Sequence, residues 1–493
     1  MATAMSGQNL PFKSGLPQLA LIVGVIVAAA FLAIFLGLIA VTANLIFVAV
    51  AVGLILGTML LAKPAWNIWL ILLFGLLVAG VLPIWVDFIA SKAIWGISIL
   101  GFMLLGSALF WLIASPGVAK NTPAFVWIAL AFFFYVLLTS FVQWHSTGEF
   151  FSGLKRYFQM WGLLFALCWF SFDKQQIRRW RLFILFVALM QLPFAVYELI
   201  DLVPLRETFG IPGLVPIDVV AGTFGSYLYS GGANAEMATF LIIVLAFLLA
   251  LRQEKQLSPG RLFLLTPLVM APLFLGETKV VVILLPMMFL VLYRNQLIAR
   301  PHYALFALML GTVFTFAAGY TYLSLSKQSM DQQVANMFSY EGYGNLKLNR
   351  YTTLTFWAEQ QGMHDPVSFV LGNGIGSSVS ASLAPGHVAK RYPHYGIGLT
   401  AASTLLWETG IFGFSLFLAL HAMAWRTAAR LRRCVTDPSV RADLTAIQAA
   451  IALFFIYLFY RSSVLDIMGF QIVFVCVLGY LAWLYRRYGQ EYT

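Results

Sequence analysis

The feature that most constrains this chain is an uncharged stretch of 44 residues that runs from Leu19 to Ala62. One membrane-spanning helix needs about 20 apolar residues, so the stretch predicts two helices that meet near residues 41–44. Its apolar region is too long for a signal peptide, and we expect it to stay as an anchor. Only 10% of the 493 residues are charged, against about 25% in soluble domains. The sequence therefore predicts a polytopic membrane protein and excludes a secreted disulfide scaffold, a coiled coil and a disordered regulator.

Apolar runs of helix length continue along the rest of the chain. They predict spans at about residues 65–86, 92–114, 122–142, 153–172, 180–201, 235–251, 261–276, 280–293, 302–324, 398–425, 444–464 and 467–485. With the two helices in the first stretch, the predicted fold class is all-α with about 14 transmembrane helices. The three cysteines, Cys168, Cys434 and Cys476, are scattered, so they predict neither a disulfide framework nor a metal site.

The basic residues predict the orientation of these spans. If the N-terminus with Lys13 is cytoplasmic and the spans alternate, the inner side receives 19 of the 30 Lys and Arg residues. The same side receives 5 of the 19 acidic residues, so its net charge is +14, against −3 for the rest of the chain. This asymmetry follows the positive-inside rule. The net charge of +11 therefore indicates orientation, with both termini cytoplasmic, and does not indicate a nucleic-acid partner.

Eleven basic residues lie outside or within the membrane in this topology, where orientation does not require them. They are Lys92, Lys155, Arg156, Arg206, Lys279, Lys327, Lys347, Arg350, Lys390, Arg391 and Arg461. Five of the eleven lie in one outer loop, residues 325–397, which is far longer than the other predicted connections. A loop of that length is more often a lid or a binding element than a linker. The loop is therefore the first place to look for a site.

Two segments of this loop have recognisable local patterns. Residues 346–361 predict a helix that ends at Gly362 and has cations and apolar residues on one face. The glycine-rich segment that begins at Leu371 follows a short apolar run typical of a strand. It lacks the Lys-Ser/Thr pair that a nucleotide-binding P-loop requires, so we interpret it as a turn that allows close backbone approach.

Four groups of motifs then follow one another between about residues 200 and 425. The first is Gly222-Thr-Phe-Gly-Ser with Gly232-Ala-Asn-Ala-Glu-Met-Ala, and the second is Leu275-Gly-Glu-Thr-Lys-Val. The third joins Asn349-Arg350 and Trp357 to His364-Asp-Pro and Leu371-Gly-Asn-Gly-Ile-Gly. The fourth is Tyr392-Pro-His394 with Trp407-Glu408-Thr-Gly410-Ile-Phe-Gly413.

In order and in predicted topology, these motifs resemble the O-antigen polymerase/O-antigen ligase family of bacterial envelope enzymes. Lys279 stands where that family usually has arginine, and Tyr395 where it usually has asparagine. His394 lies fourteen residues before Glu408, where about nine would be expected.

The resemblance implies a GT-C-like glycosyltransferase of the bacterial inner membrane, with its active site facing the periplasm. Its implied donor is a glycan on undecaprenyl diphosphate, its acceptor is a glycan hydroxyl, and it needs no metal or other cofactor. Membrane lipid and chain-length regulator or export proteins are the further implied partners. The predicted catalytic residues are His394, Arg350, Lys279 and Glu408, and the predicted diphosphate-binding residues are Arg206, Lys347, Lys390, Arg391, Arg461 and His364.

In these roles, His394 is the candidate base that takes a proton from the acceptor hydroxyl. The cations stabilise the charge that develops on the leaving diphosphate. Lys279 is expected to be a charge within the membrane, because apolar residues flank it on both sides. The corresponding domain organisation is N-terminal transmembrane helices at 1–200, a catalytic core at 201–425 and C-terminal transmembrane helices at 426–493.

Three functions remain open at this point. A polymerase would join lipid-linked repeat units into exopolysaccharide, capsule or O-antigen. A ligase would move a finished glycan from the same carrier to lipid A core or another acceptor. A flippase or transporter would move the lipid-linked glycan without chemistry, but its charges would be expected deep in several helices. The clustering of charge at one face favours an enzyme, and the single large loop favours the polymerase.

Overall fold

The computed structural model describes residues 57–85, 94–210, 215–229, 231–299, 302, 346–362, 364–380 and 385–489. The chain divides into two compact units, residues 1–63 and 64–493. Of the first unit only the helical residues 57–62 and Lys63 are described, and the account below concerns the second unit. The predicted spans in 19–62 and at 302–324 lie outside the described residues, apart from the last few residues of the first stretch and His302.

The described part of the second unit is helical and contains no β-strand. Its helices in the first half are α3 (Pro64–Leu73), the π-helix η1 (Phe74–Val78), α4 (Leu82–Trp85), α6 (Trp95–Ala114), α7 (Pro116–Lys120), α8 (Ala124–Val142), α9 (Thr147–Phe158), α10 (Trp161–Trp169), α11 (Lys174–Tyr197), the π-helix η3 (Glu198–Leu202) and α12 (Val203–Glu207). The second half has the 3₁₀ helices η4 (Pro216–Val219) and η5 (Gly222–Phe224), then α13 (Asn234–Gln253), α14 (Pro259–Leu275), α15 (Val281–Ala299), α18 (Thr352–Gln361), α19 (Pro366–Leu371), α20 (His387–Arg391), α21 (Ala401–Cys434), α22 (Pro438–Tyr457), α23 (Ser463–Asp466) and α24 (Met468–Tyr488).

Eight helices in the described residues are long and apolar enough to cross a membrane. They are α6, α8, α11 with its continuation through η3 and α12, α13, α15, α21, α22 and α24. Each coincides with one predicted span. The predicted spans 65–86 and 261–276 correspond to shorter apolar helices, α3 with η1 and α14.

The apolar surface of these helices is distributed as a membrane protein requires. In α13 and α24, 83% of the most apolar window is buried, so these two helices form the centre of the bundle together with α10 and α22. In α6, α11 and α15 only 22–33% of that window is buried. Large side chains such as Ile113, Phe263 and Ile298 are about 80% exposed. A surface this apolar is stable in lipid rather than in water, which indicates a multi-pass membrane protein.

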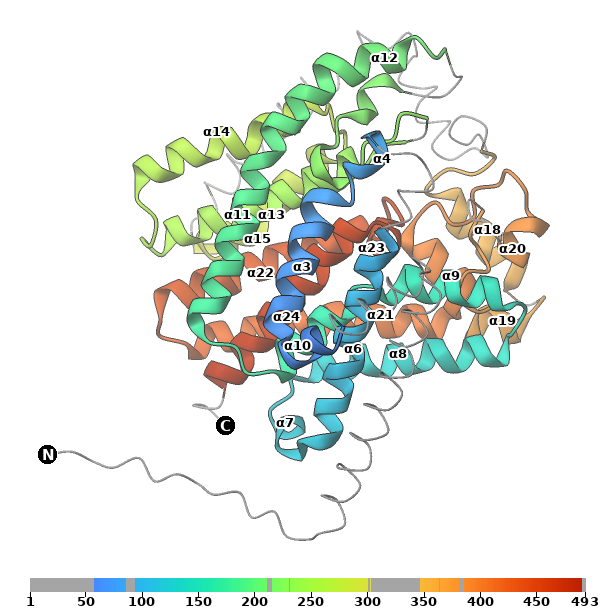
Figure 1. Ribbon diagram of the computed structural model, residues 1–493, viewed down its shortest axis with the longest axis horizontal. Helices are drawn as coiled ribbons and strands as arrows, with labels where there is room; N and C mark the ends of the chain where they lie inside the picture. Colours follow the sequence, from blue (N-terminus) through green and yellow to red (C-terminus); the bar gives the residue numbers. More distant parts are fainter. Residues whose placement is uncertain are drawn as a thin grey trace, which may run out of the picture. The chain divides into compact units, whose positions relative to one another are not determined.

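The two ends of the bundle differ in what they carry. At one end the starts of α11 and α22 are joined by the Arg181–Asp443 ion pair, at 2.6 Å. At the same end Arg441 of α22 pairs with Glu254, which follows α13, at 2.6 Å. The opposite ends of α13 and α22 are joined by the Arg461–Glu236 ion pair, and Arg350 of the outer loop contacts Tyr460, just after α22. Figure 1 shows α18, α19 and α20, in orange, grouped together next to α9. This second end carries the candidate site.

The predicted single span at 153–172 is wrong, because the chain breaks there into α9 and α10. The break is stabilised by Gln471 of α24, a fully buried side chain. Its amide donates to the carbonyls of Arg156 and Tyr157, at 2.9 and 3.0 Å, and its oxygen accepts from the amide of Met160, at 3.2 Å. Helix α9 therefore ends where this side chain satisfies its last carbonyls. Because of the break, α9 and α10 need not share one helix axis.

The outer loop also differs from the sequence-based expectation in two places. The predicted helix 346–361 begins at Thr352, since the side chain of Asn349 accepts from the amides of Tyr351 and Thr352 and holds the preceding residues in a turn. Its end at Gly362 is confirmed. The apolar run before the glycine-rich segment is helix α19, not a strand, because Asp365 caps it by accepting from the amide of Ser368.

Candidate functional site

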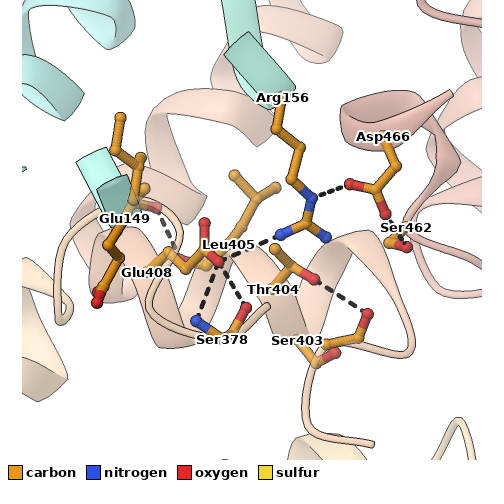
Figure 2. Close-up of polar contacts among 12 residues, drawn as sticks. Glu149, Arg156, Ser378, Ser403, Thr404, Leu405, Glu408, Ser462 and Asp466 are labelled. Carbon is orange, nitrogen blue, oxygen red and sulfur yellow. Dashed lines mark hydrogen bonds and ion pairs between the residues drawn. The ribbon is translucent and has the colours of Figure 1, made fainter. Parts of the chain in front are cut away.

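The centre of the candidate site is Arg156, near the end of α9. Its Nε–H donates to Asp466 Oδ1, and its Nη1–H donates to Glu408 Oε1 at 3.3 Å. Asp466 also accepts from the hydroxyl of Ser462. Glu408 accepts from both the amide and the hydroxyl of Ser378, at 3.2 and 2.6 Å. Figure 2 shows Arg156 entering from α9 between the two carboxylates, so that three segments far apart in the sequence meet at one guanidinium.

Glu408 is held in place by a break in helix α21. The helix is interrupted at Gly410, whose backbone has φ 64° and ψ −174°, a conformation that is essentially restricted to glycine. Gly372 has φ 81°, and a Cβ atom there would lie 2.4 Å from the Glu408 backbone. A Cβ on Gly410 would lie 2.3 Å from the carbonyl of Val370. This contact confirms that the glycine-rich turn allows close backbone approach.

We expect Gly372→Ala to destabilise the protein by about 1–3 kcal/mol, because alanine must either adopt a glycine-only conformation or push the Glu408 backbone away. Thermal unfolding in detergent should show a lower midpoint for this variant. Gly106→Ala in α6 is the matched control, because a Cβ at Gly106 meets no atom within 4 Å. An unchanged midpoint for Gly372→Ala would show that this backbone contact does not hold the two segments together.

A second buried ion pair lies beside the first. Arg461 follows α22, and its Nη1–H groups contact Glu236 Oε2 at 3.2 Å and the carbonyl of Gly232 at 2.9 Å. Glu236 is fully buried at the start of α13 and also accepts from Tyr457. Glu236 raises the pKa of Arg461 above its usual range, although burial opposes this, so the guanidinium stays charged.

Arg350 adjoins this second pair from the outer loop. Its Nε–H donates to the carbonyl of Tyr460 at 2.8 Å, and its guanidinium lies 4.3 Å from the centre of the Tyr460 ring. Arg350 therefore contacts the residue that directly precedes Arg461 in the chain. Both arginines are among the eleven basic residues that the predicted topology leaves unexplained, and Arg350 also stands in one of the motifs on which the family resemblance rests.

Some of these charged groups line a cavity of about 660 Å³. Its charged lining residues are three cations, Lys155, Arg156 and Arg461, and one acid, Asp466. The uncharged polar lining residues are Ser152, Gln159, Tyr227, Ser378, Ser380 and Ser462, and the rest of the lining consists of apolar side chains and glycines. The volume falls within the range of about 300–1,000 Å³ typical of ligand sites. The described lining therefore has a net positive charge and several hydrogen-bonding groups in one concave space.

The two cations from α9 are in different electrostatic states. Burial lowers the pKa of the Lys155 ammonium, which lies 3.9 Å from the centre of the Trp95 ring. Burial also acts to lower the pKa of Arg156, but Asp466 and Glu408 outweigh it, and the pKa is raised. Arg156 is therefore a fixed positive charge, while Lys155 would gain from an anion that enters the cavity.

Three of the ten predicted site residues lie at this cluster. Glu408 is fully buried and bonded to Arg156, Arg461 lines the cavity, and Arg350 adjoins Arg461. His394 and Lys347 lie at its edge. The amide of Lys347 donates to the carbonyl of His394 at 2.8 Å. Leu346, which precedes Lys347, and Gly396, two residues after His394, both line the cavity.

His394 is exposed and has a positive φ of 64°. Histidine is one of the few residue types other than glycine that adopt this conformation with some frequency. Lys347 is also exposed, and its ammonium lies 4.4 Å from the centre of the Tyr395 ring. Neither side chain is among those that line the cavity.

The other five predicted residues lie away from the cavity lining. Lys390 and Arg391 are exposed on α20, and His364 is exposed just before α19. Arg206 is buried on α12, where it is only 2% exposed. Lys279 is exposed in the turn between α14 and α15, and its position within the membrane stays a prediction.

Sequence reasoning selected neither Arg156 nor Asp466 as a site residue. Arg156 and Lys155 were among the eleven basic residues that the topology leaves unexplained, so a signal was present. Asp466 and Glu236 carried the complementary signal, since each is an acid at the end of an apolar run. Pairing unexplained cations with such acids would have identified both ion pairs.

A scan of the chain against protein-family models finds no match, and a search of curated proteins finds no significant match. The chemistry that the site can perform is therefore inferred from its own residues. Three cations that face a cavity, two of them fixed by buried carboxylates, suit a ligand with at least two negative charges. The site can bind and orient such a ligand and stabilise negative charge that develops on it.

Proposed function

We propose that the protein is an inverting, metal-independent glycosyltransferase that polymerises undecaprenyl-diphosphate-linked repeat units into exopolysaccharide, capsule or O-antigen. The observation that carries the proposal is the cation-lined cavity at the end of an apolar helix bundle. A lipid diphosphate has its anionic group at the membrane surface and its chain in the bilayer. A positive cavity beside membrane-spanning helices matches both parts. In the topology proposed from the sequence, this end of the bundle faces the periplasm.

In the proposed reaction an acceptor hydroxyl oxygen attacks the anomeric carbon of the donor glycan. The bond between that carbon and the phosphate oxygen breaks, and undecaprenyl diphosphate leaves with the electron pair. Arg156, Lys155 and Arg461 stabilise the charge that accumulates on the phosphate oxygens. Each charge-assisted hydrogen bond contributes about 1.5–3 kcal/mol, so two or three of them supply much of the reduction in barrier.

The proton of the acceptor hydroxyl requires a base, and His394 remains our proposed base. Its backbone position at the edge of the cavity supports this role, since Gly396 two residues later lines the cavity. Glu408 is less suited to the role than the sequence suggested, because it is fully buried behind Arg156 and bonded to Ser378. We propose Glu408 as the residue that positions Arg156.

We expect Arg461→Ala to weaken binding of the lipid-linked donor by about tenfold or more, which corresponds to the loss of one charge-assisted hydrogen bond. Binding to the reconstituted protein would measure this. Arg441→Ala is the matched control, since Arg441 also pairs with a glutamate but lies at the opposite end of the bundle. Equal donor affinity in wild type and Arg461→Ala would remove Arg461 from the proposed site.

The proposed activity is tested by giving the purified, reconstituted protein an undecaprenyl-diphosphate-linked repeat unit. The expected products are longer lipid-linked glycans and free undecaprenyl diphosphate, formed in the presence of a chelator. Transfer only after lipid A core is added would indicate the ligase instead. Movement of the donor across a vesicle membrane without release of undecaprenyl diphosphate would indicate a transporter and contradict the proposal.

A further inference from the structure

A second cluster of polar side chains lies at the opposite end of α9 from Arg156. It consists of His145, just before α9, Glu149 in its first turn, and His387 at the start of α20. One potential metal-ligand atom from each residue lies within 4.8 Å of the others. His387 Nδ1 is 2.8 Å from Glu149 Oε1, and the two imidazole rings are 4.4 Å apart, centre to centre. None of the three lines the cavity of the proposed active site.

We propose that His145, Glu149 and His387 bind one divalent transition-metal ion, of which Zn²⁺ is the best match. Two imidazoles and one carboxylate form a donor set that suits zinc, whereas Mg²⁺ and Ca²⁺ prefer oxygen ligands alone. Ligands of a tetrahedral zinc ion are each about 2.0–2.1 Å from the metal, hence roughly 3.3 Å from one another. The ligand atoms of His387 and Glu149 are 2.8 Å apart, and no pair in the cluster is more than 4.8 Å apart. Small rotations of the three side chains are therefore enough to reach the zinc geometry. Water would complete the coordination.

The surroundings of the cluster favour a fixed ligand set. The Glu149 carboxylate is only 6% exposed, and its second oxygen accepts from the backbone amide of His387 at 3.2 Å. The His145 side chain is exposed, which gives an ion a path from solvent. The ion would take the place of the contact between His387 Nδ1 and Glu149 Oε1, while the backbone amide of His387 would continue to orient the carboxylate as an outer partner. His145 would complete the protein ligands from the solvent side.

The ion would join α20 of the outer loop to the start of α9. Glu149 and Arg156 are seven residues apart and lie on the same face of α9. Between them, a Cβ on Gly153 would lie 2.6–2.8 Å from Ile375 and Gly376, so this face packs directly on the glycine-rich turn. The same turn leads to Ser378, which binds Glu408. The metal would therefore hold the loop against the helix that carries the cavity's central arginine. This inference stands independently of the proposed activity.

The test is zinc binding by the full-length protein in detergent, without a polyhistidine tag and after removal of metal with a chelator. Equilibrium dialysis with elemental analysis should give one Zn²⁺ per chain, and zinc should raise the thermal unfolding midpoint. His145→Ala and His387→Ala should each weaken binding by more than the about 10–100-fold that loss of an outer-shell partner costs. His364→Ala, an exposed histidine outside the cluster, is the control and should bind as wild type.

Co²⁺ provides a second measurement that does not depend on stability. Its visible d–d absorption should report a site with nitrogen ligands in wild type and in His364→Ala, and that signal should be lost in His145→Ala. A wild-type protein that binds no zinc at micromolar concentrations would overturn the proposal. So would retention of wild-type affinity in either His145→Ala or His387→Ala.

Discussion

Arg156→Ala is expected to reduce glycan transfer by about 10³-fold, the largest effect of any substitution considered. The variant loses the fixed cation that faces the leaving diphosphate, and removal of one such donor typically costs 10²–10³-fold. It also leaves the fully buried carboxylate of Glu408 without its cation, which costs about 3–5 kcal/mol of stability. Transfer should be measured with the reconstituted protein, per folded molecule.

Two controls separate the loss of catalysis from the loss of stability. The double variant Arg156→Ala with Glu408→Gln removes the fully buried unpaired charge and leaves only that of Asp466, which is partly exposed. We therefore expect it to regain much of the stability and none of the transfer. Arg181→Ala breaks another ion pair with a buried carboxylate, that of Asp443, at the opposite end of the bundle. It should lower stability and leave transfer by the folded protein intact. If the double variant regains transfer, Arg156 has only a structural role.

The second large effect is expected at His394, where asparagine should lower transfer by about 10²-fold and leave donor binding unchanged. Asparagine suits this test, because the backbone of His394 has a positive φ that asparagine tolerates well. Asparagine therefore keeps the turn and its hydrogen bond to Lys347 while it removes the base. His394→Gln should show a similar loss, with added strain at the turn.

Kinetics with varied donor concentration distinguish the roles of His394. A fall in kcat with unchanged donor affinity supports the base, whereas weaker donor binding alone indicates contact with the diphosphate. Transfer close to wild type in His394→Asn would exclude His394 as the base. Asp466, the acid that lines the cavity, and then Glu408 would be the next residues to test.

The membrane-spanning helices could be predicted from the sequence wherever one apolar run forms one helix. Eight spans coincide with helices of sufficient length because their hydropathy is continuous. The break between α9 and α10 could not be predicted in this way. It depends on Gln471, a side chain more than 300 residues away that satisfies carbonyls at the end of α9. A hydropathy profile cannot predict such a long-range hydrogen bond.

The candidate site could be predicted only in part, for a similar reason. Glu408 and Gly410 stand in a recognisable motif, and the structure gives a physical reason for both, since the glycine opens the helix that positions the glutamate. Arg156 stands in no such motif, and its partners are 252 and 310 residues away. Likewise, His387 is 238 residues from Glu149, so their proximity is a property of the fold alone.

The central claim is that the cavity lined by Lys155, Arg156 and Arg461 binds a lipid diphosphate. Binding of undecaprenyl diphosphate and of undecaprenol to the reconstituted protein tests it most directly, because the two ligands differ only in the diphosphate. Two charge-assisted hydrogen bonds at about 1.5 kcal/mol each predict that the diphosphate binds at least about 100-fold more tightly. That preference should disappear when Arg156 and Arg461 are both replaced by alanine. Equal affinity for the two lipids in the wild-type protein, or an undiminished preference in the double variant, would contradict the account.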